Sequence, residues 1–217
     1  MTRLLSPVVP ALLPTDTVAR ALDMMTDSKL SMLPVVLDEN YLGIVKEDDL
    51  LEWDDQSDTV EQTMSIAYKP AIMMSAHPTE ALRIMSQLHL DLLPVLDMEQ
   101  RYKGAIDKSS MLQYMAETSS FDAPGGIVVL EIKPHNYSLY EIARLFENED
   151  VMILNAQLTT TADGTMELTL KTNRTALEAV TSSLERHEYK VKEVYGDQKS
   201  MEDVMEKYNL LMNYLNM

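Results

Sequence analysis

Carboxylates are the chemically active side chains that cluster most strongly in this sequence. Glu47, Asp48 and Asp49 are consecutive, and so are Asp54 and Asp55. Consecutive side chains on a helix point in different directions, so these runs do not supply the converging pair of carboxylates that general acid–base catalysis needs. We interpret both runs as solvated charge. The first run lies where negative charge in the first turn of a short helix is favourable.

The other residue types that carry catalysis or bind metals are sparse or badly spaced. The histidines fall in different predicted elements, none at metal-ligand spacing with another: His77, His89, His135 and His187. The six glycines form neither a P-loop nor a dinucleotide-binding fingerprint. Cysteine is absent, which excludes disulfides, thiolate metal sites and a cysteine nucleophile. The sequence therefore predicts no metal site and no enzymatic activity of its own.

Composition limits the classes of partner. The chain has 217 residues, 46% of them hydrophobic, which is enough for one or two domains with real cores. With 18 Lys and Arg against 35 Asp and Glu, the formal charge of −17 argues against a surface that binds nucleic acid. No stretch is long enough to span a membrane. We expect a cytoplasmic protein.

One supersecondary pattern occurs twice. Residues 31–46 predict a β-hairpin, because two apolar runs flank an acidic turn and the proline lies early in the first run. Residues 91–107 repeat it. The Leu-Pro-Val motif of the first run begins at Leu33 and again at Leu93, which is 93 − 33 = 60 positions later. The chain therefore contains two copies of one unit.

Helices flank each predicted hairpin. In the first copy a helix is expected to begin at Thr15 and Asp16, and a short one at Glu47. In the second copy Pro78 and Thr79 precede the first of the corresponding helices, and Ser109 and Ser110 open the second. Each copy has one apolar face that it cannot bury alone, so we expect the two copies to pack together.

This repeat resembles the CBS domain, which occurs in tandem pairs. The likeness is carried by the opening at residues 15–21, the Leu-Pro-Val strand and the closing segment at residues 42–50. It implies two β-α-β-β-α units, repeat 1 at about 1–58 and repeat 2 at about 59–118. It also implies a cleft that often binds AMP, ADP, ATP or S-adenosylmethionine, usually within a homodimer.

The resemblance also implies where a ligand is held. The family signature Gly-Ile-Val-Thr-x-x-Asp uses the hydroxyl for phosphate and the carboxylate for the ribose diol. In the first copy Lys46 replaces the hydroxyl and Asp49 keeps the carboxylate. In the second copy Asp107 and Ser110 stand at these positions, so negative charge lies where a phosphate belongs. We expect the first half-site to be the better one.

Each of the two better candidates has a structural alternative. Lys46 can be a solvated lysine at a strand end. Asp49 can act through the helix dipole alone, as an acidic residue in a first turn.

A second domain is predicted at residues 127–196, after a small and polar linker at 119–126. Its pattern is β-α-β-β-α-β, the ferredoxin-like arrangement, with Ser138 capping the first helix and Asp163-Gly164 marking a hairpin. The fold class is therefore α+β throughout.

The second domain resembles an ACT domain, a module that binds amino acids or pairs with its own copies. In that family an Asp-x-Pro-Gly loop follows the first strand and brings backbone N–H groups to the ligand. Here the loop contains Pro134, His135 and Asn136, so the proline matches and the glycine does not. The order of a CBS pair and an ACT-like domain is also similar to small AcuB-type regulatory proteins of acetoin utilisation.

The last segment, residues 197–217, predicts a tail helix. Its apolar residues recur every three or four positions and form one stripe: Met201, Val204, Tyr208, Leu211 and Leu215. Two heptads do not sustain a free coiled coil, so the stripe packs either on its own domain or across a dimer interface.

From these observations we expect a non-enzymatic regulatory protein. Its CBS pair senses a small ligand, and its ACT-like domain helps to form a homodimer. Two alternatives stay open at this point. One is a dimeric interaction scaffold whose ligand sites have decayed, and the other is a regulatory subunit of a separate enzyme.

Overall fold

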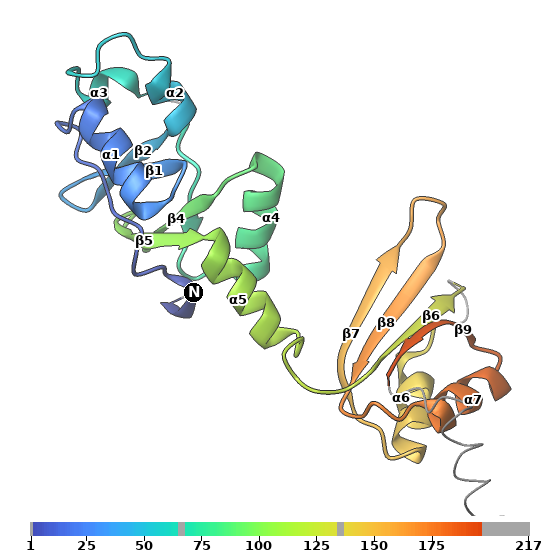
Figure 1. Cartoon of the computed structure of the whole chain (residues 1–217). Coiled ribbons are helices and arrows are strands. Elements are labelled where there is room, and N and C mark those ends of the chain that lie inside the picture. The colour runs from blue at the N-terminus through green and yellow to red at the C-terminus, as the bar shows by residue number, and fades with distance from the viewer. Residues whose placement is uncertain (1, 65–67, 134–136, 197–217) are drawn as a thin grey trace, which may run out of the picture. The chain divides into compact units, whose positions relative to one another are not determined.

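The computed structural model describes residues 2–64, 68–133 and 137–196. The chain forms two compact units, Met1–Met115 and Ala116–Met217, and each is described by itself (Figure 1). Both are built from helices and sheets, so the fold class is α+β, as predicted. In the described ranges no helix is both long and apolar enough to cross a membrane.

The first unit contains the two predicted copies in chain order. A short 3₁₀ helix precedes them at Thr2–Leu4. The first copy consists of α1 (Val18–Ser28), β1 (Met32–Leu37), β2 (Asn40–Lys46), α2 (Glu47–Leu51) and α3 (Val60–Thr63). The second copy consists of β3 (Ile72–Met73), α4 (Pro78–Leu88), β4 (Leu92–Leu96), β5 (Tyr102–Asp107) and α5 (Lys108–Thr118).

Local chemistry sets the helix ends. The side chain of Thr17 caps α1 by accepting from the backbone N–H of Arg20. The helix therefore begins two residues later than the predicted start at Thr15 and Asp16, because the Asp16 carboxylate instead accepts from the Leu13 N–H at 2.8 Å. Elsewhere the copies agree closely. For example, α1 and α4 both end in a left-handed residue, Lys29 and His89 respectively.

The two hairpins are antiparallel and also follow the repeat. In the second copy a short strand precedes the helix, and Ile72 pairs in parallel with Val95. In the first copy the same relationship is reduced to one isolated bridge between Leu12 and Val35. Ile72 lies 60 positions after Leu12, and Val95 lies 60 positions after Val35, so the two pairs are equivalent. The first strand of each predicted β-α-β-β-α unit is thus present, but in the first copy only as that bridge.

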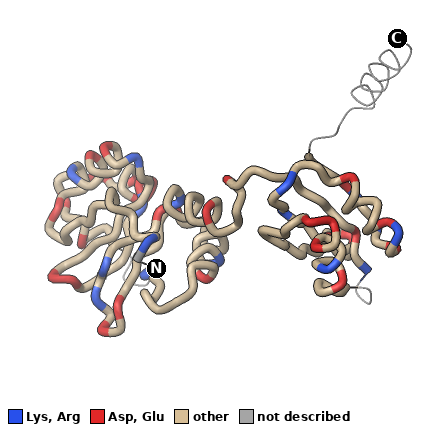
Figure 2. The backbone as a smooth tube through the Cα atoms, turned by 90° about the horizontal axis from the view of Figure 1, so that it is seen from below, with Lys and Arg blue, Asp and Glu red and all other residues tan. Residues whose placement is uncertain are grey.

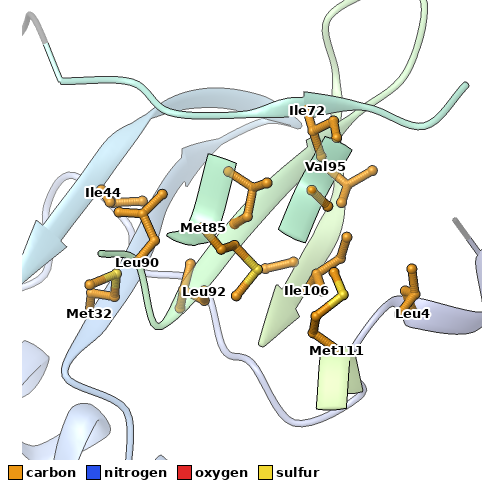
Figure 3. Close-up of a cluster of buried hydrophobic side chains, with 13 residues drawn as sticks. Leu4, Met32, Ile44, Ile72, Met85, Leu90, Leu92, Val95, Ile106 and Met111 are labelled. Atoms are coloured by element: carbon orange, nitrogen blue, oxygen red, sulfur yellow. The ribbon is translucent and has the colours of Figure 1, made fainter. Parts of the chain in front are cut away.

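The two copies share part of their core. Thirteen buried side chains form one cluster that contains Met32 and Ile44 of the first copy beside Leu90 and Leu92 of the second (Figure 3). Burial of such side chains contributes about 1.5–3 kcal/mol each. The first copy also has a core cluster of its own, around Val18, Leu33 and Leu50, so the shared cluster joins the two copies rather than supplying their whole core.

The second unit is a ferredoxin-like domain. Its elements are β6 (Ile127–Ile132), α6 (Leu139–Asn148), β7 (Ile153–Thr160), β8 (Met166–Thr172), α7 (Glu178–Arg186) and β9 (Lys190–Tyr195). The strands are antiparallel in the order β7-β8-β6-β9, and the two helices cover one face of the sheet (Figure 1).

Two local predictions for this domain are confirmed. Ser138 caps α6 by accepting from the Glu141 N–H. The turn between β7 and β8 contains Asp163 and Gly164, and the glycine has a φ of +85°. The predicted tail helix at 197–217 lies outside the described residues.

Candidate ligand-binding half-sites

The two hairpins of the first unit meet through equivalent residues. The rings of Tyr41, the second residue of β2, and Tyr102, the first residue of β5, stack with centroids 6.5 Å apart. Beside them Asn40 forms an isolated bridge with Arg101, again an equivalent pair. The two copies are therefore related by an approximate two-fold axis, and the candidate half-site of each lies at the far end of the second strand of its hairpin.

The tyrosine hydroxyls at this axis differ. Tyr41 donates to the carbonyl of Pro70 at 2.9 Å. The hydroxyl of Tyr102 is buried and has no partner among the residues that the structure describes. Burial raises the pKa of Tyr102 to about 12, so the hydroxyl stays protonated at neutral pH.

The first candidate half-site contains Lys46 and Asp49, which lie three positions apart where β2 passes into α2. Lys46 is the last residue of β2 and the N-cap residue of α2, and Asp49 is in the first turn of α2. The Lys46 ammonium lies 5.2 Å from the centroid of the Tyr68 ring, a cation–π contact. Asp49 is exposed and makes no hydrogen bond or ion pair within the described ranges. Its carboxylate is therefore available to a ligand.

A close approach of the backbone shapes this half-site. The chain after α3 passes over β2 at Gly43, where an added Cβ would lie 2.9 Å from Met64 Cε and 3.3 Å from the Tyr68 carbonyl oxygen. Glycine permits this approach because it has no side chain. The approach holds Tyr68 beside the end of β2, where its ring meets Lys46.

The loop after α2 is anchored close to Asp49. Trp53 packs partly buried against the core of the first copy. Its indole N–H donates to the Asp58 carboxylate at 3.0 Å. This anchor fixes the segment that follows the first half-site.

The second half-site is built differently. The carboxylate of Asp107 is only 5% exposed, and it accepts from the Ser6 hydroxyl at 2.6 Å and from the Ser110 N–H at 2.7 Å. Burial pushes the pKa of Asp107 up, but hydrogen bonds from Ser6, Ser110 and Ser109 outweigh it and hold the pKa below its ordinary value. Asp107 is thus an ionised cap at the start of α5, and sequence reasoning missed its partner Ser6.

An apolar groove lies between the helices of the second copy. It has a volume of about 240 Å³. Its lining includes Leu82, Met85, Met111, Leu112 and Met115. The Leu112 side chain is 69% exposed. This surface can hold an apolar partner.

In the ferredoxin-like domain the predicted loop residues Pro134, His135 and Asn136 lie outside the described residues. The helix that follows, α6, is joined to a distant residue by a hydrogen bond. The hydroxyl of Tyr189, which lies between α7 and β9, donates to the Glu141 carboxylate of α6 at 2.9 Å. Burial first, and then this bond to Glu141, raise the pKa of Tyr189 to about 12.

Charged groups are dispersed over the described ranges of both units. Asp and Glu are spread along the backbone of each unit (Figure 2). No group of three or more His, Asp or Glu side chains there could hold a metal ion.

Comparison with known families gives one match. Residues 2–55 match the family model of the CBS domain. The matched segment contains α1, the first hairpin and α2, and so includes Lys46 and Asp49. None of the curated protein sequences matches the chain.

Several solved structures are similar to about half of the chain. One is a CBS domain pair/ACT domain protein from Thermotoga maritima, with 24% identity over 53% of this chain and 94% of the other, and a TM-score of 0.49. Another is CBSX2 in complex with AMP, with 21% identity over 52% and 93% of the two chains and a TM-score of 0.47. The cytosolic domain of the Mg²⁺ channel MgtE in complex with ATP has 21% identity over 51% and 46%, with a TM-score of 0.45.

Proposed function

We propose that this chain is a cytoplasmic, non-enzymatic regulatory protein that binds an adenine nucleotide, or a related small anion such as S-adenosylmethionine, at the first half-site. Asp49 accepts hydrogen bonds from the two ribose hydroxyls. Lys46 leaves the ring of Tyr68 and meets the phosphate as a point charge. The C-terminal ferredoxin-like domain helps to form a homodimer. Kinship to AcuB-type proteins remains a prediction from domain order.

The observation that carries this proposal is the contrast between one carboxylate in each half-site, Asp49 at the ribose position of the first and Asp107 at the phosphate position of the second. Asp49 is exposed and has no partner in the described ranges. Asp107, at the second half-site, is buried and accepts from Ser6 and from Ser110. Within the described residues neither Asp49 nor Lys46 forms an ion pair, so the first half-site offers both an acceptor and a positive charge. A phosphorylated sugar needs both.

Regulation requires that the ligand binds two arrangements of the protein with different affinity. A ligand that binds both arrangements equally shifts nothing. The first half-site is built from Lys46, Asp49 and Tyr68, and Tyr68 belongs to the segment that joins the two copies. We propose that ligand binding changes the position of this joining segment and so alters how the copies pack.

A second function, a dimeric interaction scaffold, is favoured by two surfaces. One is the apolar groove that contains Leu112. The other is β7, an edge strand that pairs only with β8 and whose last five residues are exposed. An open edge can accept a strand from another chain. The scaffold function does not need a ligand, which separates the two functions experimentally.

Thermal unfolding of the purified full-length protein tests the proposal. The compounds are AMP, ADP, ATP, S-adenosylmethionine and a set of amino acids. Each is titrated up to about a hundred times the dissociation constant expected for it. At that ratio a bound ligand stabilises the fold by roughly 2.7 kcal/mol. For a chain of this size the melting temperature then rises by roughly 5–10 °C.

Each result selects one function. A rise with an adenine compound supports the proposal. A rise with an amino acid alone moves the site to the loop at 134–136 and overturns it. No rise with any compound favours the scaffold. A catalytic protein that co-purifies under gentle conditions would instead indicate a regulatory subunit of a separate enzyme.

A further inference from the structure

Residues 4–6 of the N-terminal segment lie on the second half-site. The side chain of Leu4 is 1% exposed and belongs to the same core cluster as Ile106 of β5 (Figure 3). Leu5 packs against β5 at Gly104, where an added Cβ would meet Leu5 Cδ2 at 3.4 Å. The segment is therefore held against the last residues of this strand by apolar contacts.

Polar contacts fix the same segment at the ligand-facing end of the strand. The backbone N–H of Ser6 donates to the Ala105 carbonyl at 2.9 Å. The Ser6 hydroxyl donates to Asp107 at 2.6 Å. By the repeat, Asp107 stands where Lys46 stands in the first copy, the position that would face a phosphate. In the second copy that position is therefore occupied by a contact within the chain.

We propose that residues 4–6 occupy the second half-site in cis, so that the CBS-like pair takes one nucleotide per chain, at the first half-site. This inference rests on the proposed function. A nucleotide whose phosphate enters the second half-site would have to displace the Ser6 hydroxyl from Asp107. It would then bring a phosphate against the buried negative charge of Asp107, which is repulsive. At the first half-site the equivalent position carries the positive charge of Lys46.

Hydrogen exchange of the unliganded full-length protein tests the seating of the segment without any ligand. The Ser6 amide should be protected. Ser6→Ala should accelerate exchange at residues 5 and 6 by about tenfold, because a hydrogen bond to a charged group is lost. The matched control is Ser57→Ala. Ser57 lies in the first copy, away from the second half-site, and its hydroxyl donates to the Asp55 carboxylate at 2.6 Å. Exchange of the Ser6 amide at the rate of an unfolded chain would overturn the proposal.

Equilibrium dialysis with AMP tests the number of sites. One AMP per chain is expected, and two per chain would overturn the inference even if the proposed function is correct. Asp49→Ala should weaken AMP binding at the single site by about tenfold or more, which assigns the site to the first copy. If AMP and the other adenine compounds do not bind at all, the proposed function is wrong. The exchange rate of the Ser6 amide then decides by itself whether the segment is seated on the half-site.

Discussion

The hydroxyl of Ser31 donates to the carboxylate of Asp91, and these two residues occupy the same position in the two copies, 91 − 31 = 60 residues apart. Asp91 also forms an ion pair with Lys108. The Ser31 carbonyl accepts from the Glu47 N–H, and the Asp91 carbonyl accepts from the Lys108 N–H. A single hydrogen bond across the approximate two-fold axis thus joins the ends of the two hairpins next to both half-sites.

The first prediction concerns the pH dependence of this contact. The hydrogen bond from Lys108, and then that from Ser31, hold the pKa of Asp91 below its ordinary value. Because the pKa is lower in the folded than in the unfolded state, the ionised carboxylate stabilises the fold above about pH 4, and this contribution is lost as the pH falls through the folded pKa. Asp91→Asn should therefore lower the free energy of unfolding by about 1 kcal/mol at pH 7 and by less at pH 3.

Urea unfolding at the two pH values measures that difference. Asp54→Asn is the control, since Asp54 is exposed and makes no hydrogen bond in the described ranges. It should leave the free energy of unfolding unchanged at pH 7. If Asp91→Asn lowered the free energy of unfolding equally at both pH values, the ionised Asp91 carboxylate would not be the source of the stabilisation.

The second prediction tests Asp49. Asp49→Ala should weaken AMP binding by about tenfold or more, because two charge-assisted hydrogen bonds to the ribose are lost. Asp48→Ala is the matched control, since Asp48 is an exposed carboxylate in the same helical turn and has the same effect on the helix dipole. Calorimetric titration measures both affinities. Equal effects of the two substitutions would show that Asp49 acts only through the helix.

The third prediction separates the phosphate contact from the sugar contact. Lys46→Gln should weaken binding of AMP by about tenfold and leave binding of adenosine unchanged, because only AMP carries the phosphate. Lys69→Gln removes an exposed lysine of the same unit and serves as the control. The measurement is the ratio of the two dissociation constants. A parallel loss for AMP and adenosine would remove Lys46 from the phosphate position.

The fourth prediction concerns the homodimer. Leu112 is 69% exposed on the groove between α4 and α5, so Leu112→Glu should leave the monomer folded and disrupt a dimer that uses this groove. The control is Met98→Glu, because the Met98 side chain is 79% exposed and lies outside the groove. Light scattering coupled to size-exclusion chromatography gives the mass of each variant. A Leu112→Glu protein that keeps the mass of the wild type would exclude this groove as the interface.

The fifth prediction tests two glycines of the ferredoxin-like domain. At Gly125 an added Cβ would lie 1.8 Å from the Thr172 carbonyl oxygen, and φ is +146°. Gly125→Ala should therefore lower the free energy of unfolding by roughly 3 kcal/mol. At Gly164 the φ is +85° but the space is open, so Gly164→Ala should cost only about 1 kcal/mol. Chemical unfolding measures both values. If Gly125→Ala and Gly164→Ala lowered the free energy of unfolding by similar amounts, the close approach at Gly125 would be contradicted.

Much of the fold could be predicted from the sequence, because it is specified by local patterns. The Leu-Pro-Val runs marked the two central strands, and Ser138 and Asp163-Gly164 marked a helix start and a turn. The start of α1 was wrong by two residues, because Asp16 accepts from a backbone N–H in the preceding turn. The first strand of the first copy was too short to show a pattern.

The long-range polar contacts could not be predicted in this way. Ser6 and Asp107 are 101 positions apart, and Ser31 and Asp91 are 60 apart. Serine and aspartate are common at exposed positions, so neither residue type signals a partner at such a distance. Resemblance to a family placed Asp107 at a ligand position. The contact with Ser6 could be found only from the structure, in which the N-terminal segment packs against β5.

The anchored indole near Asp49 has a further consequence. Trp53 is the single tryptophan of the chain and lies in the first copy, four positions after Asp49. Its fluorescence therefore reports on one place in a protein of two units, with no background from the ferredoxin-like domain. Fluorescence excited selectively at this indole therefore reports on the surroundings of the first half-site. Ligand arrival there can be followed in real time without attaching a label.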